Sequence, residues 1–151
     1  MRITLLAALV AQLSTPTPRP GHATVSPSPT DVNGAAGAKL TLFVDVTPKS
    51  GIHVYAPGSK DYIPVAVKLN PLATIKAGKV TYPQSEIMSF ADEKVPVFAK
   101  PFRLTQELTL AKSVKAGDTV VVAGMVTYQA CDDKVCYAPE QAPVSWNVRV
   151  Q

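Results

Sequence analysis

Hydrophobic and polar residues alternate along much of the chain after Lys39, a pattern typical of β-strands with one buried face. The clearest case is VSWNVRV, residues 144–150, in which every second residue is apolar and the residues between are polar. We therefore expect Trp146 to anchor the core. Three further segments alternate in the same way, with inward-facing positions Leu40, Leu42, Val44 and Val46; Val65, Val67 and Leu69; and Leu104, Gln106, Leu108 and Leu110.

Two segments depart from this alternation. TVVVAGMVTY, residues 119–128, is apolar on both faces, which predicts a central strand covered on both sides. Residues 85–102 are polar and contain two prolines, and we expect a short helical turn or a long functional loop there. Turn signals such as PKSG, KAGK and KAGD separate the strands, and fourteen prolines leave no window of helical period. These features predict an all-β fold, an immunoglobulin-like antiparallel β-sandwich.

The N-terminus has the pattern of an export signal. A basic start precedes the apolar run ITLLAALVAQL, which is too short to span a bilayer. We interpret residues 1–23 as a signal peptide with a Pro-rich leader, residues 24–37 as a disordered linker, and residues 38–151 as one domain. Cleavage after Ala11, Ser14 or Ala23 fits the pattern. No cysteine lies near the apolar run, which predicts a periplasmic protein without a lipid anchor.

The charge of the chain excludes some classes of function. The net charge is +4, but residues 1–23 hold two arginines and no acid, which leaves 13 basic residues against 11 acidic ones. The lysines are scattered singly, so we expect no nucleic-acid partner. His53 is the single histidine beyond the leader, and neither a Gly-rich phosphate loop nor a Ser/His/Asp arrangement is present. Hydrolytic catalysis therefore lacks its residues.

The two cysteines of the chain lie on one short segment, TYQACDDKVCYAPE, residues 127–140. In the chain-entropy model, a disulfide that closes a ring of about six residues stabilises a fold by roughly 2 kcal/mol, against about 4 to 5 for one that joins distant strands. The spacing of Cys131 and Cys136 still allows a structural disulfide, a metal site or a redox pair. A Cu(I) site would combine both cysteines with His53 and Met88.

The residues around the cysteines carry a resemblance to a known family. YQACDDKVCYAP is similar to the active-site loop of the N-terminal domain of the thiol-disulfide interchange protein DsbD, with a shorter spacer, DDKV, than the best-known members have. GIHVYAPGSKDYIPVAVKL and VTYPQSE also resemble family segments, so that the resemblance covers roughly residues 38–151. It implies an immunoglobulin-like domain in which Cys131 and Cys136 form a redox-active disulfide, with no other cofactor.

The same resemblance implies the partners of the domain. It would take electrons from a membrane-embedded thiol reductant and pass them to thioredoxin-like periplasmic proteins. For this chain, both partners would be separate proteins. The alternatives are a non-catalytic immunoglobulin-like interaction module with a structural disulfide, or a Cu(I)-handling protein. Because Cys131 directly follows an apolar strand, we expect it to be the more buried sulfur and Cys136 to be the one that partners contact.

The resemblance also implies residues that surround the disulfide. His53 and Tyr55 stand where the family has aromatic residues beside the cysteines, with a histidine here in place of one aromatic residue. Tyr128 and Tyr137 flank the cysteines in sequence and would either cover the disulfide or fill the sandwich. In FADEKVPVF, residues 90–98, the resemblance places a cap loop over the disulfide, with the candidate residues Phe90, Asp92 and Glu93.

Overall fold

A computed structural model describes residues 21–90 and 92–151, which form twelve strands in three four-stranded sheets. The first sheet has the order β1 (Ala23–Pro27), β3 (Lys39–Pro48), β9 (Phe102–Leu110) and β6 (Ile75–Thr81). The second has the order β2 (Asp31–Gly34), β12 (Glu140–Val150), β10 (Thr119–Tyr128) and β5 (Ala66–Leu69). The third has the order β11 (Ala130–Cys131), β4 (His53–Tyr55), β8 (Glu93–Phe98) and β7 (Glu86–Phe90).

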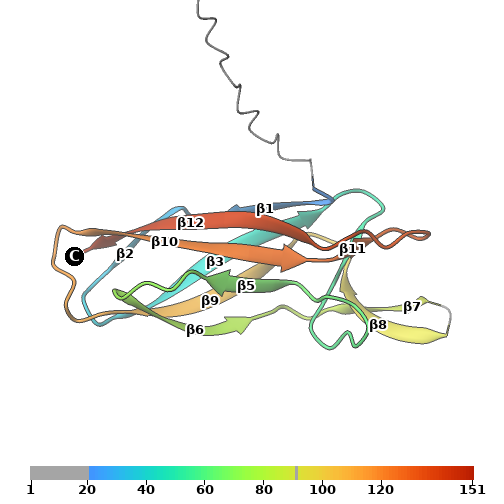
Figure 1. The fold of residues 1–151 in the computed structure, drawn as a ribbon, viewed down its shortest axis with the longest axis horizontal. Helices are drawn as coiled ribbons and strands as arrows, with labels where there is room; N and C mark the ends of the chain where they lie inside the picture. The colour runs from blue at the N-terminus through green and yellow to red at the C-terminus, as the bar shows by residue number, and fades with distance from the viewer. Residues whose placement is uncertain (1–20, 91) are drawn as a thin grey trace, which may run out of the picture.

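The first two sheets form the predicted immunoglobulin-like sandwich, and the third lies at the end away from the C-terminus (Figure 1). All strand pairings among the described residues are antiparallel except the parallel pair β2 and β12. The described part of the chain contains no helix that could cross a membrane. The third sheet carries Cys131 in β11, so the fold places the cysteines at one tip of the sandwich.

The core follows the predicted alternation. Trp146 is completely buried, and the alternating apolar residues of β3, β9 and β12 face the same interior. Gln106 shares this face, and its buried amide nitrogen donates to the carbonyl oxygens of Gly78 and Glu107. The prediction that both faces of β10 are covered was wrong, because this strand alternates too and Val121 is 55% exposed. One face of its sheet packs on the core, and the other, which carries Val121, is exposed or partly exposed.

The predicted disordered linker, residues 24–37, is instead part of the sandwich. β1 pairs with β3, and β2 pairs with β12, so each forms an edge of its sheet. An edge strand tolerates proline because one row of its N–H groups is unpaired, which explains how Pro-rich sequence contributes to a sheet. Residues 1–20 of the predicted signal peptide lie outside the described residues, whereas His22 and Ala23 of the predicted leader belong to the folded domain.

Residues 85–102 form neither a helical turn nor a long loop. They contain the β7–β8 hairpin, whose turn includes Asp92 with a φ of 71°, a left-handed conformation that aspartate tolerates better than most residues. Val95 and Val97 of β8 are buried and alternate around Pro96, so the period of a strand is present but short. The hairpin projects beside the cysteines and builds one wall of the site.

Candidate redox site

The cysteines lie where the chain leaves the central strand β10. Residues 130 and 131 turn into the third sheet, in which Ala130 pairs with Val54 and Cys131 with His53. Cys131 and Cys136 are joined by a disulfide, with their Cα atoms 4.1 Å apart. Cys131 is only 1% exposed, whereas Cys136 is exposed. The difference in burial agrees with the expectation from the apolar strand that precedes Cys131.

Asp132 holds the shape of the six-residue ring, Cys131 to Cys136, that the disulfide closes. Its Oδ1 accepts the backbone N–H groups of Lys134 and Val135, each at 2.7 Å, and its Oδ2 accepts the Tyr137 hydroxyl at 2.6 Å. Such bonds from an Asp to the following backbone stabilise a tight turn. The bonds from Tyr137, Lys134 and Val135 lower the pKa of Asp132 to about 2. The carboxylate therefore stays ionised and anchors the ring throughout the physiological pH range.

Tyr55 of β4 contacts both sulfurs. Its hydroxyl oxygen lies 2.9 Å from Cys131 Sγ and 3.2 Å from Cys136 Sγ, and the side chain is almost fully buried. The Tyr62 ring stacks on the Tyr55 ring at a centroid distance of 4.1 Å. Burial and the neighbouring Tyr62 raise the pKa of Tyr55 to about 12, with a smaller effect from Glu93. The hydroxyl thus keeps its proton and can donate to a sulfur at neutral pH.

His53 enters the site by packing. Its ring stacks on Phe90 at 5.0 Å and meets Tyr55 edge-on at 5.8 Å between centroids. Burial lowers the pKa of His53, against the opposite influence of Asp133 and Asp132, so that the imidazole is neutral at neutral pH. Its Nε2 is buried and has no hydrogen-bond partner among the described residues. The imidazole therefore contributes to the site by packing against the rings of Phe90 and Tyr55.

The β7–β8 hairpin covers the buried side of the disulfide. Tyr55, Val95, Val97 and Cys131 form a small apolar cluster separate from the main core, and Tyr62, Met88 and Phe90 pack against it. Asp92 and Glu93 lie at the hairpin turn and are exposed. The segment expected to form a cap therefore lies over Cys131, while Cys136 stays exposed.

The model of the N-terminal domain of the thiol:disulfide interchange protein DsbD matches residues 23–146. The chain belongs to this family. The match starts at the first residue of β1, so the DsbD N-terminal domain as the family defines it includes the two edge strands that were expected to be linker. It also includes both cysteines and every aromatic residue named above.

Solved structures with a similar fold include the N-terminal periplasmic domain of ScsB from Proteus mirabilis. The two share 13% sequence identity with a TM-score of 0.54, over 83% of this chain and 45% of that one. This chain therefore spans less than half of the ScsB domain, and the likeness shows a shared fold. A family 123 glycoside hydrolase from Clostridium perfringens is more distant, at 8% identity and a TM-score of 0.43, over 87% of this chain and 28% of that one. A search of curated proteins finds no match.

In this DsbD N-terminal domain, the hydroxyls of Tyr128 and Tyr137 bond to carboxylates and not to the sulfurs of the disulfide. Tyr128 is buried in the main core, and its hydroxyl donates to Glu140 at 2.6 Å. Tyr137 reaches the ring through its bond to Asp132, and its own ring stacks on His22. Tyr62 and His22, which sequence reasoning missed, complete the surroundings of the cysteines.

The cysteines and His53 do not come together as a metal site in the part of the chain that the structure describes. No group of three or more His, Cys, Asp or Glu side chains there could hold a metal ion. Met88, the fourth ligand considered for Cu(I), packs against the apolar cluster around Cys131. The Tyr55 hydroxyl instead lies within hydrogen-bond distance of both sulfurs, and the rings of His53 and Tyr62 pack against the Tyr55 ring.

Replacing Phe90 with alanine is expected to make Cys131 react several-fold faster with a thiol-alkylating reagent, because access limits the reactions of a buried thiol. The Cys136→Ser background leaves Cys131 as the sole thiol, so mass spectrometry of the quenched reaction reports on it alone. Ile87→Ala is the matched control, since Ile87 lies on the same strand and is 62% exposed. Equal rates in the Phe90 and Ile87 variants would mean that the hairpin does not act as a cap.

Proposed function

We propose that this DsbD-family domain acts in the periplasm as an electron relay, reduced by a membrane-embedded thiol protein and oxidised by thioredoxin-like clients. The observation that carries the proposal is the asymmetry of the disulfide. Cys136 is exposed, whereas Cys131 is buried and lies within hydrogen-bond distance of the Tyr55 hydroxyl. Cys136 can thus form a mixed disulfide with a partner protein, and Cys131 can then attack that disulfide and release the partner.

The transfer proceeds by two thiol-disulfide exchanges. In the reduced domain, the Cys136 thiolate attacks the client disulfide, and one client sulfur leaves as a thiolate that takes up a proton. The Cys131 thiolate then attacks Cys136 Sγ, which breaks the bond to the client and releases the second client thiolate. The domain loses two electrons and two protons, and the client disulfide becomes a dithiol. The membrane reductant restores the domain by the reverse sequence.

Tyr55 supports the second exchange. Burial disfavours a thiolate at Cys131, and a hydroxyl that donates a hydrogen bond to the sulfur offsets that cost. The Tyr55 oxygen lies 2.9 Å from Cys131 Sγ in the disulfide form, so the donor is in place before reduction. The aromatic surroundings of Cys131, including His53 and Phe90, keep other thiols from reaching it. We therefore assign Cys136 to contact with partners and Cys131 to their release.

The reduction potential separates a relay from a structural disulfide. We expect equilibration with glutathione or dithiothreitol buffers, followed by the mass of alkylated thiols, to give a potential above about −300 mV, because disulfides that exchange with thioredoxin-like proteins lie in that range. The Cys131→Ser/Cys136→Ser variant has no thiol to alkylate, so it is the control for mass added elsewhere in the domain. A potential well below about −300 mV is typical of inert structural bonds and would favour the interaction module instead.

A further inference from the structure

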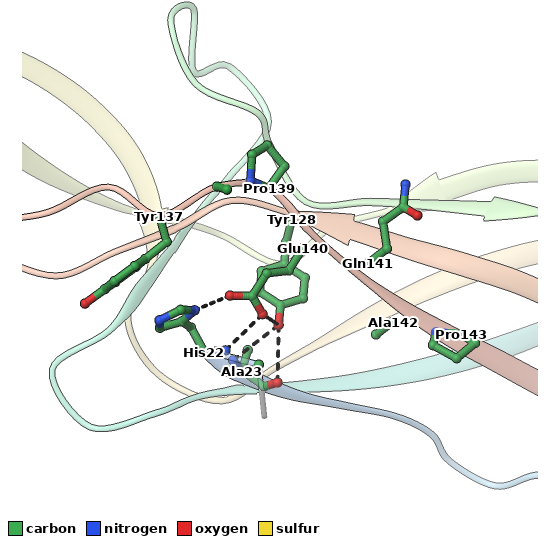
Figure 2. A pocket seen from close by; sticks show the side chains of 11 residues that line it. His22, Ala23, Tyr128, Tyr137, Pro139, Glu140, Gln141, Ala142 and Pro143 are labelled. Carbon is green, nitrogen blue, oxygen red and sulfur yellow. Dashed lines mark hydrogen bonds and ion pairs between the residues drawn. The ribbon is translucent and has the colours of Figure 1, made fainter. Parts of the chain in front are cut away.

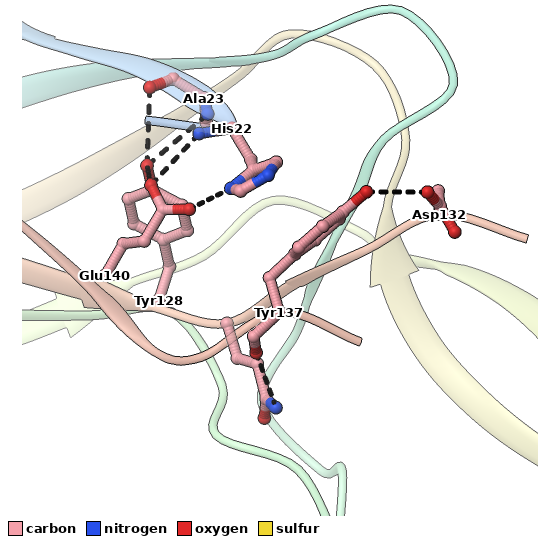
Figure 3. A network of polar contacts seen from close by, with 7 residues as sticks. His22, Ala23, Tyr128, Asp132, Tyr137 and Glu140 are labelled. Carbon is pink, nitrogen blue, oxygen red and sulfur yellow. Dashed lines mark hydrogen bonds and ion pairs between the residues drawn. The ribbon is translucent and has the colours of Figure 1, made fainter. Parts of the chain in front are cut away.

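We propose that His22 is a positioning residue for the redox ring: by stacking on Tyr137, it holds the ring in the conformation in which Cys131 and Cys136 can bond. The inference deepens the proposed function, because it concerns the same site. It starts from a polar cluster near the cysteines that the exchange mechanism does not use, and His22, one residue before the family match begins, belongs to it. Figure 3 shows this cluster, with Tyr137 between His22 and Asp132.

Glu140 fixes the position of His22. The carboxylate Oε2 accepts the backbone N–H of His22 at 3.0 Å and the Tyr128 hydroxyl at 2.6 Å, while Oε1 accepts the imidazole Nδ1–H. Burial raises the pKa of Glu140, but the bonds from His22 and Tyr128 outweigh it and hold that pKa below its ordinary value. Because Tyr128 ends β10 and Glu140 begins β12, two core strands hold the imidazole in one place.

The imidazole covers the residue that follows Cys136. The rings of His22 and Tyr137 lie 3.7 Å apart between centroids, with 20° between their planes. Two hydrogen bonds also fix Tyr137. Its hydroxyl donates to Asp132, and its backbone N–H donates to the carbonyl oxygen of Ala130 at 2.9 Å. Asp132 follows Cys131 directly. The stack therefore restrains Tyr137, the side chain that connects the Cys136 end of the ring to Asp132 at the Cys131 end.

The importance of this link grows when the disulfide is reduced. Without the covalent bond, the two sulfurs stay close only as far as the loop keeps its shape, and that closeness sets how readily Cys131 attacks Cys136. The bonds of Asp132 and the stack on Tyr137 both favour the conformation of the closed ring. Loss of the stack should therefore favour the dithiol and raise the reduction potential.

The surroundings of His22 allow the ring and the polar contact to be changed separately. A groove of about 690 Å³ beside it is lined by residues of the N-terminal edge and of the segment from Tyr137 to Pro143 (Figure 2). The His22 side chain is 32% exposed, so it can be replaced without removing a fully buried side chain. His22→Phe keeps an aromatic ring on Tyr137 without the bond to Glu140. His22→Gln keeps a polar group for Glu140 without the ring.

Equilibrium with glutathione tests the inference without any client protein. Oxidised glutathione forms a mixed disulfide with Cys136, and the Cys131 thiolate then displaces glutathione as its thiolate and closes the ring. We expect His22→Gln to lower the equilibrium constant for ring closure about three- to tenfold. This is the change expected from losing the interaction energy of one stacked aromatic pair. This corresponds to a potential that is roughly 15 to 30 mV less negative. The Cys136–glutathione adduct should accumulate, and His22→Phe should stay near the parent protein.

The results that would overturn the inference are distinct from a failure of the relay, which the potential of the parent protein decides. An unchanged potential in His22→Gln, or equal shifts in both variants, would show that the stack does not position the ring. The double variant His22→Gln/Tyr137→Leu should shift no further than Tyr137→Leu alone, and an additive shift would also contradict the inference. The exported protein must retain His22, so a mature chain that begins at Thr24 would rule out this role.

Discussion

Replacing Cys136 with serine is expected to abolish the mixed disulfide with a thioredoxin-like protein, whereas replacing Cys131 with serine should let it accumulate. Cys136 is exposed and Cys131 is 1% exposed beneath the β7–β8 hairpin, so only the first sulfur can approach another protein. In Cys131→Ser, the thiol that would release the partner is absent. The expected contrast is therefore nearly all or none.

The experiment needs a client that cannot release itself. A thioredoxin-like protein without its resolving cysteine, with the remaining cysteine activated as a mixed disulfide to a small thiol, reacts once and stays attached. A non-reducing gel and peptide mass spectrometry then count the adducts and locate them. The Cys131→Ser/Cys136→Ser variant is the control for non-specific adducts. Adducts found mainly on Cys131 would reverse the assignment of the two sulfurs.

Replacing Tyr55 with phenylalanine is expected to raise the pKa of the Cys131 thiol in the reduced protein by roughly one to two units. A hydrogen bond to a charged group stabilises it by about 1.5 to 3 kcal/mol, and one pKa unit corresponds to about 1.4 kcal/mol. The Tyr55 hydroxyl is buried and 2.9 Å from this sulfur, so water cannot easily replace it. Release of the client by Cys131 should slow accordingly at neutral pH.

Thiolate absorbance against pH in the Cys136→Ser background measures the pKa without requiring a reagent to reach the buried sulfur. Tyr82→Phe is the matched control, because Tyr82 is partly buried against the main core, whereas Cys131 belongs to the separate cluster around Tyr55. Equal pKa values in the Tyr55 and Tyr82 variants would mean that the hydroxyl does not stabilise the thiolate. The contribution of Tyr55 would then be limited to packing.

The parts of the fold that the sequence predicted are those with long alternation. The predicted inward positions of β3, β9 and β12 are buried, except Leu40, which is partly buried against the core. β1, β2 and the β7–β8 hairpin were missed because they are short, contain or adjoin prolines, and depend on neighbouring strands for their hydrogen bonds. A pattern within one segment does not reveal which strand it will pair with.

The features of the site also differ in whether the sequence predicts them. The difference in burial between Cys131 and Cys136 was predictable, because it depends on the local passage from an apolar strand to a polar turn. Tyr128 is only three residues before Cys131, yet it faces the main core, since side chains of a strand alternate between its faces. Tyr62 stacks on Tyr55 because the loop between them folds back on the site. No local pattern in the sequence predicts this contact.

The most direct measurement of the proposed function is transfer of electrons to an oxidised thioredoxin-like protein. The reduced domain, freed of small thiols, is mixed with one equivalent of such a client of higher reduction potential, and both proteins are alkylated and weighed. The relay predicts that each domain gains the Cys131–Cys136 disulfide while one client disulfide becomes a dithiol. Dithiothreitol, which reduces the same client, is the positive control. A client that dithiothreitol reduces but the domain leaves oxidised would contradict the relay.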